Sequence, residues 1–331
     1  MKKNSYLFNV KIKTVSPLAI IENSEIICGE MLIKIKKLAI ITDTDEGKKI
    51  EYSPYITANG LRGLLRRLAT RNFVNQAKDN ESVETFNDSD IHAMLSGSGV
   101  SKQELSYSDK QKIEKKNPIL SVFGTGIILG SKLKVANAMP ETEIIKNLVR
   151  RQSIVKVDDI LSNTGFVTLF SKEQISDWEK AVNKNSDDRK KDREKEKLAK
   201  ELGEDFERTA KKESIRTYGQ REYITPNSEF FGSFLLENAT QVELGMFLHT
   251  LKSFVEFGRI GASQSSGFGV VDIHIEDDKN LINIDRISDD KYIYNAKIDF
   301  NLSDIYKEAY NSYNDFLKTI KKDNIEVISV L

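Results

Sequence analysis

Four arginines, Arg62, Arg66, Arg67 and Arg71, occupy the segment "ANGLRGLLRRLATR" with no carboxylate among them. Arg62 and Arg66 are four residues apart, as are Arg67 and Arg71, so on a helix each pair shares a face. No Asp or Glu occurs from residue 60 to residue 77, so none of the four has an i,i+4 partner. Like charges at this spacing repel, and the pattern is typical of a helix that binds an external anion. The alternatives are acidic partners elsewhere in the fold, or water.

The same segment has the apolar spacing of a helix. Five apolar residues recur at i, i+3, i+4, i+7 and i+8: Leu61, Leu64, Leu65, Leu68 and Ala69. Asn59 is the predicted N-cap, and the arginines fall off the apolar stripe. The free N–H groups and the dipole at the start of this helix, at "ANG", favour a phosphate there.

A glycine-rich segment, "EFGRIGASQSSGFGVV", is the second candidate for anion binding. Its glycines let the backbone approach a ligand closely, its small side chains add neutral donors, and no acid occurs between Glu256 and Asp272. An ordinary glycine-rich connection is the alternative. The candidate binding residues are Gly258, Arg259, Gly261, Ser263, Gln264, Ser265 and Gly267.

A third, weaker group of cations lies in "NLVRRQSIVKVDDIL", where Arg150, Arg151 and Lys156 cluster. Alone, this group fits a solvated surface equally well.

Signals for catalysis are poor. His92, His249 and His274 are far apart in sequence, and the last two fit structural positions in a helix and a strand. The glycines of "GTGIILGSK" do not have the spacing of a P-loop. Asp43 and Asp45 lie in an acidic turn that could hold a cation, although a solvated turn is the simpler interpretation. We therefore predict no catalytic residue, no metal and no cofactor.

Composition limits the kind of partner. The 331 residues include 50 Lys+Arg and 50 Asp+Glu, so a polyanion must be held by a local patch and not by a uniformly basic surface. The single Cys28 excludes a disulfide within the chain and fits a reducing compartment. No apolar run is long enough to cross a bilayer, and no secretory h-region follows the N-terminal lysines. These features predict a soluble, cytoplasmic protein.

The order of the elements predicts the fold. Alternating strand patterns at residues 6–15, near 133, at 221–238 and at 269–277 are separated by helical patterns at 59–71 and 242–257. This order predicts an α+β, ferredoxin-like (RRM-like) sheet with both helices on one face. The polar stretches between these elements are then insertions.

Four segments carry a resemblance to a known family: "YITANGLRGLLRR", "NPILSVFGTG", "TPNSEFFGSFLLEN" and "FGRIGASQSSGFGVV". They resemble signature segments of the RAMP superfamily of CRISPR systems. More narrowly, they resemble the backbone subunit that polymerises along the crRNA, most of all its type IV version.

The resemblance implies a single domain with a ferredoxin-like palm and inserted elements. The palm would comprise residues 5–75, 117–152 and 218–278, with a finger-like insertion at 79–116, a charged thumb at 155–217 and a C-terminal extension at 279–331. Its RNA contacts would be Asn59, Arg62, Arg66 and Arg67, then Arg150, Arg151 and Lys156, and then the loop from Gly258 to Gly267.

The resemblance also implies partners and a role in antiviral defence. The partners would be crRNA, copies of the chain stacked head to tail, other effector subunits and a complementary target nucleic acid. Two alternatives stay open. One is a type III-like subunit that also cleaves target RNA through Asp43 or Asp45 and a divalent ion. The other is a ferredoxin-like enzyme or binding module for a small phosphorylated ligand.

Overall fold

The chain divides into two compact units in the computed structural model. The first comprises Met1–Asn23, Lys34–Arg151 and Glu222–Leu331, and the second Ser24–Ile33 and Gln152–Arg221. The structure describes residues 4–27, 30–44, 47–79, 88–97, 106–125, 129–141, 148–156, 171, 173, 217–279, 281–289 and 291–319. Most of the predicted thumb and parts of the predicted finger lie outside these residues.

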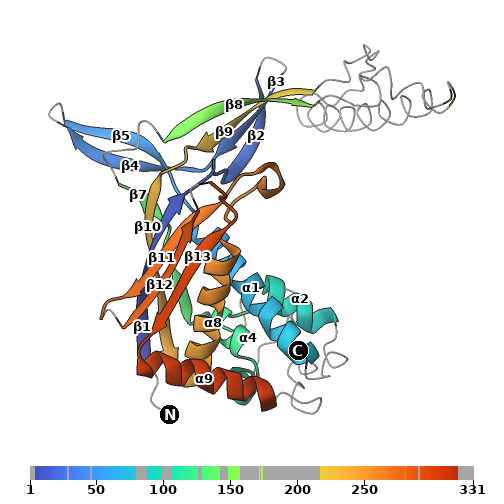
Figure 1. Ribbon diagram of the computed structural model, residues 1–331, viewed down its shortest axis with the longest axis vertical. Helices are drawn as coiled ribbons and strands as arrows, with labels where there is room; N and C mark the ends of the chain where they lie inside the picture. The colour runs from blue at the N-terminus through green and yellow to red at the C-terminus, as the bar shows by residue number, and fades with distance from the viewer. Residues whose placement is uncertain are drawn as a thin grey trace. The chain divides into compact units, whose positions relative to one another are not determined.

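The first unit is built on a seven-stranded antiparallel sheet (Figure 1). Its strands are β1 (Asn4–Thr14), β6 (Leu133–Val135), β7 (Met139–Pro140), β10 (Glu229–Ala239), β11 (Val271–Asp277), β12 (Ile282–Ser288) and β13 (Ala296–Leu302). They lie in the order β13-β12-β11-β1-β10-β6, and β7 also pairs with β10. Helix α1 (Ala58–Asp79) separates β1 from β6, and α8 (Gln241–Phe257) separates β10 from β11. The central order β11-β1-β10-β6 with these two crossovers is ferredoxin-like, so the predicted α+β fold is confirmed.

Strand β1 shows why one face of this sheet is buried. Phe8, Val10 and Ile12 are at most 3% exposed, whereas Asn9 and Lys13, which alternate with them, are exposed. Alternation places the first set on the face against which the helices pack. Each such side chain contributes about 1.5–3 kcal/mol by leaving water. The opposite face of the sheet is mixed: it carries polar and charged side chains together with exposed apolar ones such as Phe231 and Ile287.

Helices α1, α8 and α9 (Asp304–Thr319) lie together on the buried side of the sheet (Figure 1). A capping box between Thr240 and Glu243 begins α8, and Gly258 ends it in the left-handed conformation, as its sequence predicts. Helices α8 and α9 approach closely at Gly245, where a Cβ would lie 2.1 Å from the Ala309 carbonyl oxygen.

The "NPILSVFG" segment forms a short buried helix, α4 (Pro118–Phe123), after α2 (Asp88–Ser96) and α3 (Tyr107–Lys116). The Asn117 side chain caps α4 by accepting hydrogen bonds from the N–H groups of Ile119 and Leu120 at 3.1 and 3.0 Å. Gly124 follows with φ 70°, where a Cβ would lie 2.5 Å from the Leu129 carbonyl oxygen. The motif therefore has a structural explanation: it starts and stops one buried turn of helix.

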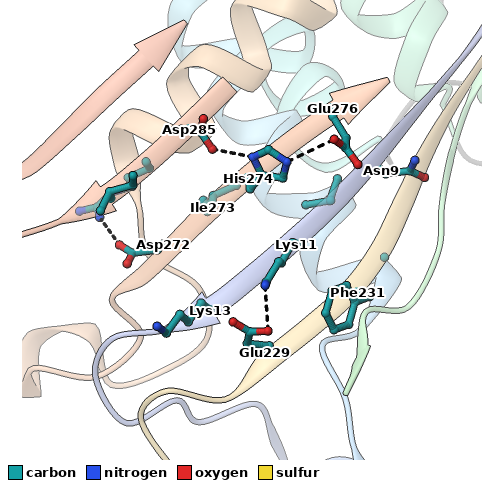
Figure 2. Close-up of a pocket in the computed structure, with 14 residues that line it drawn as sticks. Asn9, Lys11, Lys13, Glu229, Phe231, Asp272, Ile273, His274, Glu276 and Asp285 are labelled. Atoms are coloured by element: carbon teal, nitrogen blue, oxygen red, sulfur yellow. Dashed lines mark hydrogen bonds and ion pairs between the residues drawn. The ribbon is translucent and has the colours of Figure 1, made fainter. Parts of the chain in front are cut away.

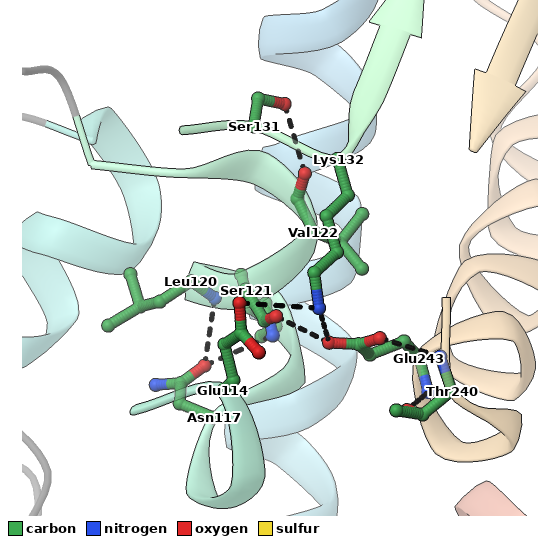
Figure 3. Close-up of polar contacts among 10 residues, drawn as sticks. Glu114, Asn117, Leu120, Ser121, Val122, Ser131, Lys132, Thr240 and Glu243 are labelled. Carbon is green, nitrogen blue, oxygen red and sulfur yellow. Dashed lines mark hydrogen bonds and ion pairs between the residues drawn. The ribbon is translucent and has the colours of Figure 1, made fainter. Parts of the chain in front are cut away.

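A buried ion pair connects α4, α8 and the start of β6 (Figure 3). The Glu243 side chain is 1% exposed and lies 2.6 Å from Lys132 Nζ. It also accepts hydrogen bonds from the Ser121 hydroxyl and, at 2.7 Å, from the Thr240 N–H. One carboxylate thus caps a helix and pairs with a nearly buried cation.

Two smaller sheets complete the described chain. In the first unit, β4 (Lys37–Thr44) and β5 (Gly47–Pro54) form a hairpin, and their register places Ala39, Ile41, Ile50 and Tyr52 on one exposed face. The described strand residues of the second unit belong to a four-stranded sheet. Its order is β2 (Ile21–Ile27), β3 (Glu30–Ile35), β9 (Thr217–Ile224) and β8 (Val149–Lys156), with β3 and β9 parallel.

His249 predicts a pH dependence of stability. Its ring stacks on Tyr310 at 3.8 Å between centroids, and burial, with Lys252 nearby, lowers the pKa of His249 to about 4. Between pH 6.5 and 4 the His249 imidazole is therefore protonated in the unfolded chain and neutral in the native state. Stability should fall as the pH decreases through this window, by about 2–3 kcal/mol from this residue.

The measurement is the free energy of unfolding by urea at several pH values, for the wild type and for His249→Phe. The variant retains an aromatic ring at this position but cannot be protonated. Titrating carboxylates are common to both proteins and cancel in the difference. The wild type should lose more stability than the variant as the pH decreases. A constant difference from pH 6.5 to 4 would contradict the assignment.

Candidate nucleic-acid interface

Helix α1 begins two residues earlier than its sequence suggests. The Thr57 hydroxyl accepts from the Gly60 N–H at 3.1 Å, and the Asn137 side chain accepts from the Ala58 N–H at 2.7 Å. The predicted N-cap, Asn59, is therefore wrong: Asn59 lies exposed in the first turn. Thr57, another residue whose side chain can cap a helix, lies two positions before Asn59 and forms the N-cap instead. Asn59 is still placed where its side chain can contact a ligand.

Arg62 and Arg66 both donate to the end of α4. The Nη2 atoms of both residues donate to the Phe123 carbonyl oxygen, and Arg66 Nη2 also donates to the carbonyl oxygen of Gly124. These are the carbonyl groups that a helix end leaves without a partner, and they carry its negative partial charge. The partners of these arginines are thus a helix end, which is neither of the alternatives that the sequence left open.

Arg66 is almost fully buried, with 6% of its surface exposed. Its Cζ lies 5.6 Å from the centroid of the Phe123 ring, and its guanidinium lies where a Cβ of Gly97 would be. Burial, followed by the nearby Arg62, lowers the pKa of Arg66 to about 10, so the group stays charged at neutral pH. The expectation that Arg66 lies off the packed face is therefore wrong, because α2 and α4 cover it.

Arg67 and Arg71 are exposed on the same helix. The Arg67 guanidinium lies toward the helix start, 3.4 Å from where a Cβ of Gly63 would be. Among the described residues, no ion pair joins Arg62, Arg67 or Arg71 to a carboxylate. Arg62 is partly buried and donates to a carbonyl, so its charge is not neutralised. These three cations are the part of the arginine helix that can meet a ligand.

The glycine-rich segment is a tightly held loop. The Ile260 N–H donates to the Gly269 carbonyl at 2.8 Å, which closes the base of the loop beside the Arg259–Val270 bridge. Two hydrogen bonds of 2.8 Å attach the loop to the segment after β1: Ala262 N–H to the Ala19 carbonyl, and Gly269 N–H to the Pro17 carbonyl. A Cβ on Gly269 would lie 2.1 Å from the Ile260 carbonyl oxygen, so glycine is required there.

The tip of this loop presents small polar groups. Ser263 adopts the left-handed conformation with φ 61°, and a single 3-10 turn, Gln264–Ser266, follows. Ser265 and Ser266 are exposed, while Ser263 and Gln264 are partly buried. Gly267 ends the turn with φ 81°. The loop thus holds hydroxyl and amide donors in a fixed arrangement at the surface.

The third predicted group, Arg150, Arg151 and Lys156, contains one paired and one unpaired arginine among the described side chains. Arg151 lies 3.6 Å from the buried Glu222 carboxylate, which also pairs with Lys37 at 3.0 Å. Arg150 is exposed, and the described residues include no carboxylate paired with it. The side chain of Lys156 lies outside the described residues, as do the side chain of Asp43 and the whole of Asp45.

The three groups belong to the same end of the large sheet. Thr14, the last residue of β1, pairs with Val271, the first of β11, so the glycine-rich loop lies at this end. Ile56, just before α1, pairs with Ala138, which directly precedes β7 and therefore lies near the start of β10. The turn before β10 is bonded to Leu148, two residues from Arg150. Segments distant in sequence thus bring unpaired cations to one end.

The open face of the sheet is different. It forms an open groove of about 770 Å³, lined by residues of β1, β10, β11 and β12 (Figure 2). Lys11 lies 2.8 Å from Glu229, and His274 lies 2.6 Å from Asp285 and 3.4 Å from Glu276. The charges there are largely paired, and no His, Cys, Asp and Glu group among the described residues could hold a metal ion.

Sequence reasoning missed two residues beside the glycine-rich loop. Arg286 is 4% exposed, and its guanidinium lies where a Cβ of Gly258 would be. Burial lowers its pKa, and Asp272, 3.4 Å away, opposes the shift. The second residue is Tyr294, whose ring centroid lies 4.7 Å from the Cζ atom of Arg259. Arg286 left one signal, since in "INIDRIS" it takes an inward-facing position of the alternation; Tyr294 left none.

The fold and its cationic end define a ferredoxin-like α+β protein with a candidate anion-binding surface. A family model for the RAMP superfamily matches residues 11–272, which is most of the chain. The chain therefore belongs to the RAMP superfamily.

Solved structures that are similar to this chain include a chain of a "Type IV-B CRISPR Complex", with a TM-score of 0.46 and 14% identity; the similarity covers 81% of this chain and 90% of that chain. No curated protein sequence matches. None of the helices in the described ranges has the length and apolar character needed to span a membrane.

Proposed function

We propose that this chain is a crRNA-binding subunit of a CRISPR effector complex that binds the sugar–phosphate strand without reading its sequence. Membership of the RAMP superfamily supports the class of protein. The observation that carries the proposal is the set of cations at one end of the sheet that lack a carboxylate partner in the described chain: Arg62, Arg67, Arg150 and Arg259.

Lysines on β13 and α9 provide a contrast. Lys297 lies 2.9 Å from Asp299, and Lys318 lies 2.9 Å from Asp315. A chain of zero net charge that pairs its lysines on β13 and α9 leaves arginines unpaired beside the glycine-rich loop. A phosphodiester strand would supply the missing negative charge.

The chemistry of these groups suits a guide RNA. A guide must leave its base edges free for pairing, so its protein should bind phosphates and sugars. Guanidinium groups, backbone N–H groups and serine hydroxyls bind phosphate without distinguishing bases. The described interface offers all three.

The proposal extends to assembly. Copies of the chain would stack head to tail along the RNA, because heterologous contacts do not close on themselves. The exposed apolar face of the β4–β5 hairpin, with Ile41 70% and Tyr52 66% exposed, is a surface that such a contact could cover. We further propose a cytoplasmic, non-catalytic subunit that acts with other effector subunits on a complementary target, most like those of type IV systems.

The test is a charge reversal. Arg67, Arg150 and Arg259 replaced together by Glu should weaken binding of unstructured single-stranded RNA by about 100-fold or more, because three phosphate contacts become repulsive. The slope of log affinity against log salt should become less steep by about 2, at 0.7 per phosphate. Both quantities come from fluorescence anisotropy titrations at several salt concentrations.

The matched control changes net charge equally at paired, exposed cations outside the proposed interface: Lys134, Lys307 and Lys318 replaced together by Glu. It should bind RNA within about threefold of the wild type, because none of the three belongs to the group of cations proposed to contact phosphate. Equal losses in both triple variants would indicate a non-specific charge effect. Unchanged binding by the arginine variant, with both proteins folded by circular dichroism, would refute the proposal.

An intact complementary RNA after incubation of the assembled complex with Mg²⁺ is the expected result for a non-catalytic subunit.

A further inference from the structure

The turn between β12 and β13 places two exposed tyrosines beside the glycine-rich loop. Tyr292 is 58% exposed and Tyr294 is 56% exposed. The Arg259 Cζ lies 4.7 Å from the centroid of the Tyr294 ring. The Tyr294 hydroxyl lies 4.0 Å from where a Cβ of Gly267 would be. Tyr294 therefore stands against both the base and the tip of the loop.

Hydrogen bonds hold this turn in place. The Asp289 N–H donates to the Asn295 carbonyl at 2.9 Å, and the Asn295 N–H donates to the Tyr292 carbonyl at 2.7 Å. The Asp289 carboxylate accepts from the N–H groups of Lys291 and Tyr292, both at 2.8 Å. Its charge is thus directed to the backbone of the turn. The tyrosines stand on an ordered turn, so presenting their rings costs little further entropy.

The pairing of Arg259 with Tyr294 suits a nucleotide better than it suits either group alone. A guanidinium over a ring keeps its N–H donors at its edge, where a phosphate oxygen can accept them. The exposed part of the ring offers a π-face to a base. Stacking on aromatic side chains binds every base, and it is used with cationic grooves in sequence-independent binding of single strands.

We propose that Tyr294, with Tyr292 beside it, is a stacking platform for one base of the RNA strand whose phosphate Arg259 contacts. The inference rests on the proposed RNA-binding function and adds a contact to a base face, which leaves the pairing edge free. It assigns a binding role to the C-terminal extension, which the sequence did not connect with RNA.

The test separates base contacts from phosphate contacts. The probes are one unstructured single-stranded RNA and the same strand made of abasic ribose-phosphate units. Tyr294→Ala should weaken binding of the RNA by about 5- to 150-fold, the range for removing one base–aromatic stack, and leave binding of the abasic strand unchanged. Tyr294→Phe keeps the ring and should bind both strands like the wild type. Arg259→Gln should weaken binding of both strands.

The outcomes are distinguishable. If the wild type binds neither strand, the proposed function fails and the inference fails with it. If the wild type binds RNA and Tyr294→Ala binds it equally well, or loses affinity for both strands equally, the platform is refuted while the proposed function stands. A fluorescent base analogue in the strand gives a second measurement: stacking quenches it in the wild type and in Tyr294→Phe, and Tyr294→Ala should restore its emission.

Discussion

Glu243→Ala should lower the free energy of unfolding by about 3–5 kcal/mol, because it leaves a nearly buried ammonium group without its carboxylate. Lys132 is 11% exposed and lies 2.6 Å from Glu243, with Glu114 3.7 Å away as a weaker partner. The substitution also removes the acceptor of the Thr240 N–H at the start of α8. Loss of a capping interaction alone costs about 1 kcal/mol.

A double-mutant cycle measures the pair. Lys132→Met should be strongly destabilising, since it leaves a carboxylate that is 1% exposed without its cation. The double variant Lys132→Met/Glu243→Gln keeps similar volumes and should recover part of the loss, because neither charge remains buried. Urea unfolding of the wild type, Lys132→Met, Glu243→Gln and the double variant gives the coupling energy. Strict additivity of the two single losses would show that the pair does not act as a unit.

The sequence predicts the frame of this protein well because burial leaves a regular trace. In β1 the alternation of Phe8, Val10 and Ile12 with polar neighbours fixes which face packs against the helices. The spacing of α8 and its stop at Gly258 predict the second crossover helix. Alternating strand and helix patterns in this order then leave few sheet topologies open.

The same reasoning could not find the partners of the arginine helix. Carboxylates can be sought in a sequence, but the carbonyl oxygens of Phe123 and Gly124 are backbone atoms present at every residue. Only the fold makes the end of α4 a site that needs donors. The four arginines therefore form one pattern in sequence and two classes in space, with Arg66 packed inside and Arg67 exposed.

The candidate site was predicted in part for a related reason. The glycine-rich loop is recognisable because several of its positions require glycine, as Gly269 does against the Ile260 carbonyl. Tyr294 comes from a polar segment after the core strands, and its position beside Arg259 depends on β12 and β13 extending the sheet. A contact between a helix–strand loop and the turn of a hairpin leaves no periodic signal in either segment.

Arg66→Ala should lower the free energy of unfolding by about 2–4 kcal/mol, through a cavity beside Phe123 and the loss of charge-assisted hydrogen bonds to a buried helix end. Relief of the burial that lowers the pKa of Arg66 to about 10 offsets part of this cost. Arg67→Ala, one residue away but exposed, should change stability by about 0.5 kcal/mol or less. Chemical unfolding of both variants measures the difference.

The order of the two variants should be reversed for RNA binding: the variant that is less destabilised should lose more RNA affinity. Arg67→Ala should weaken binding and reduce its salt dependence, whereas Arg66→Ala, measured where it is still folded, should bind RNA like the wild type because Arg66 is 6% exposed. Arg66→Met, which fills much of the cavity, provides a better-folded version of the same test. If Arg66→Met folds and still loses RNA affinity, Arg66 acts on the strand directly or through Arg62. The division of this helix into a structural and a binding arginine would then be wrong.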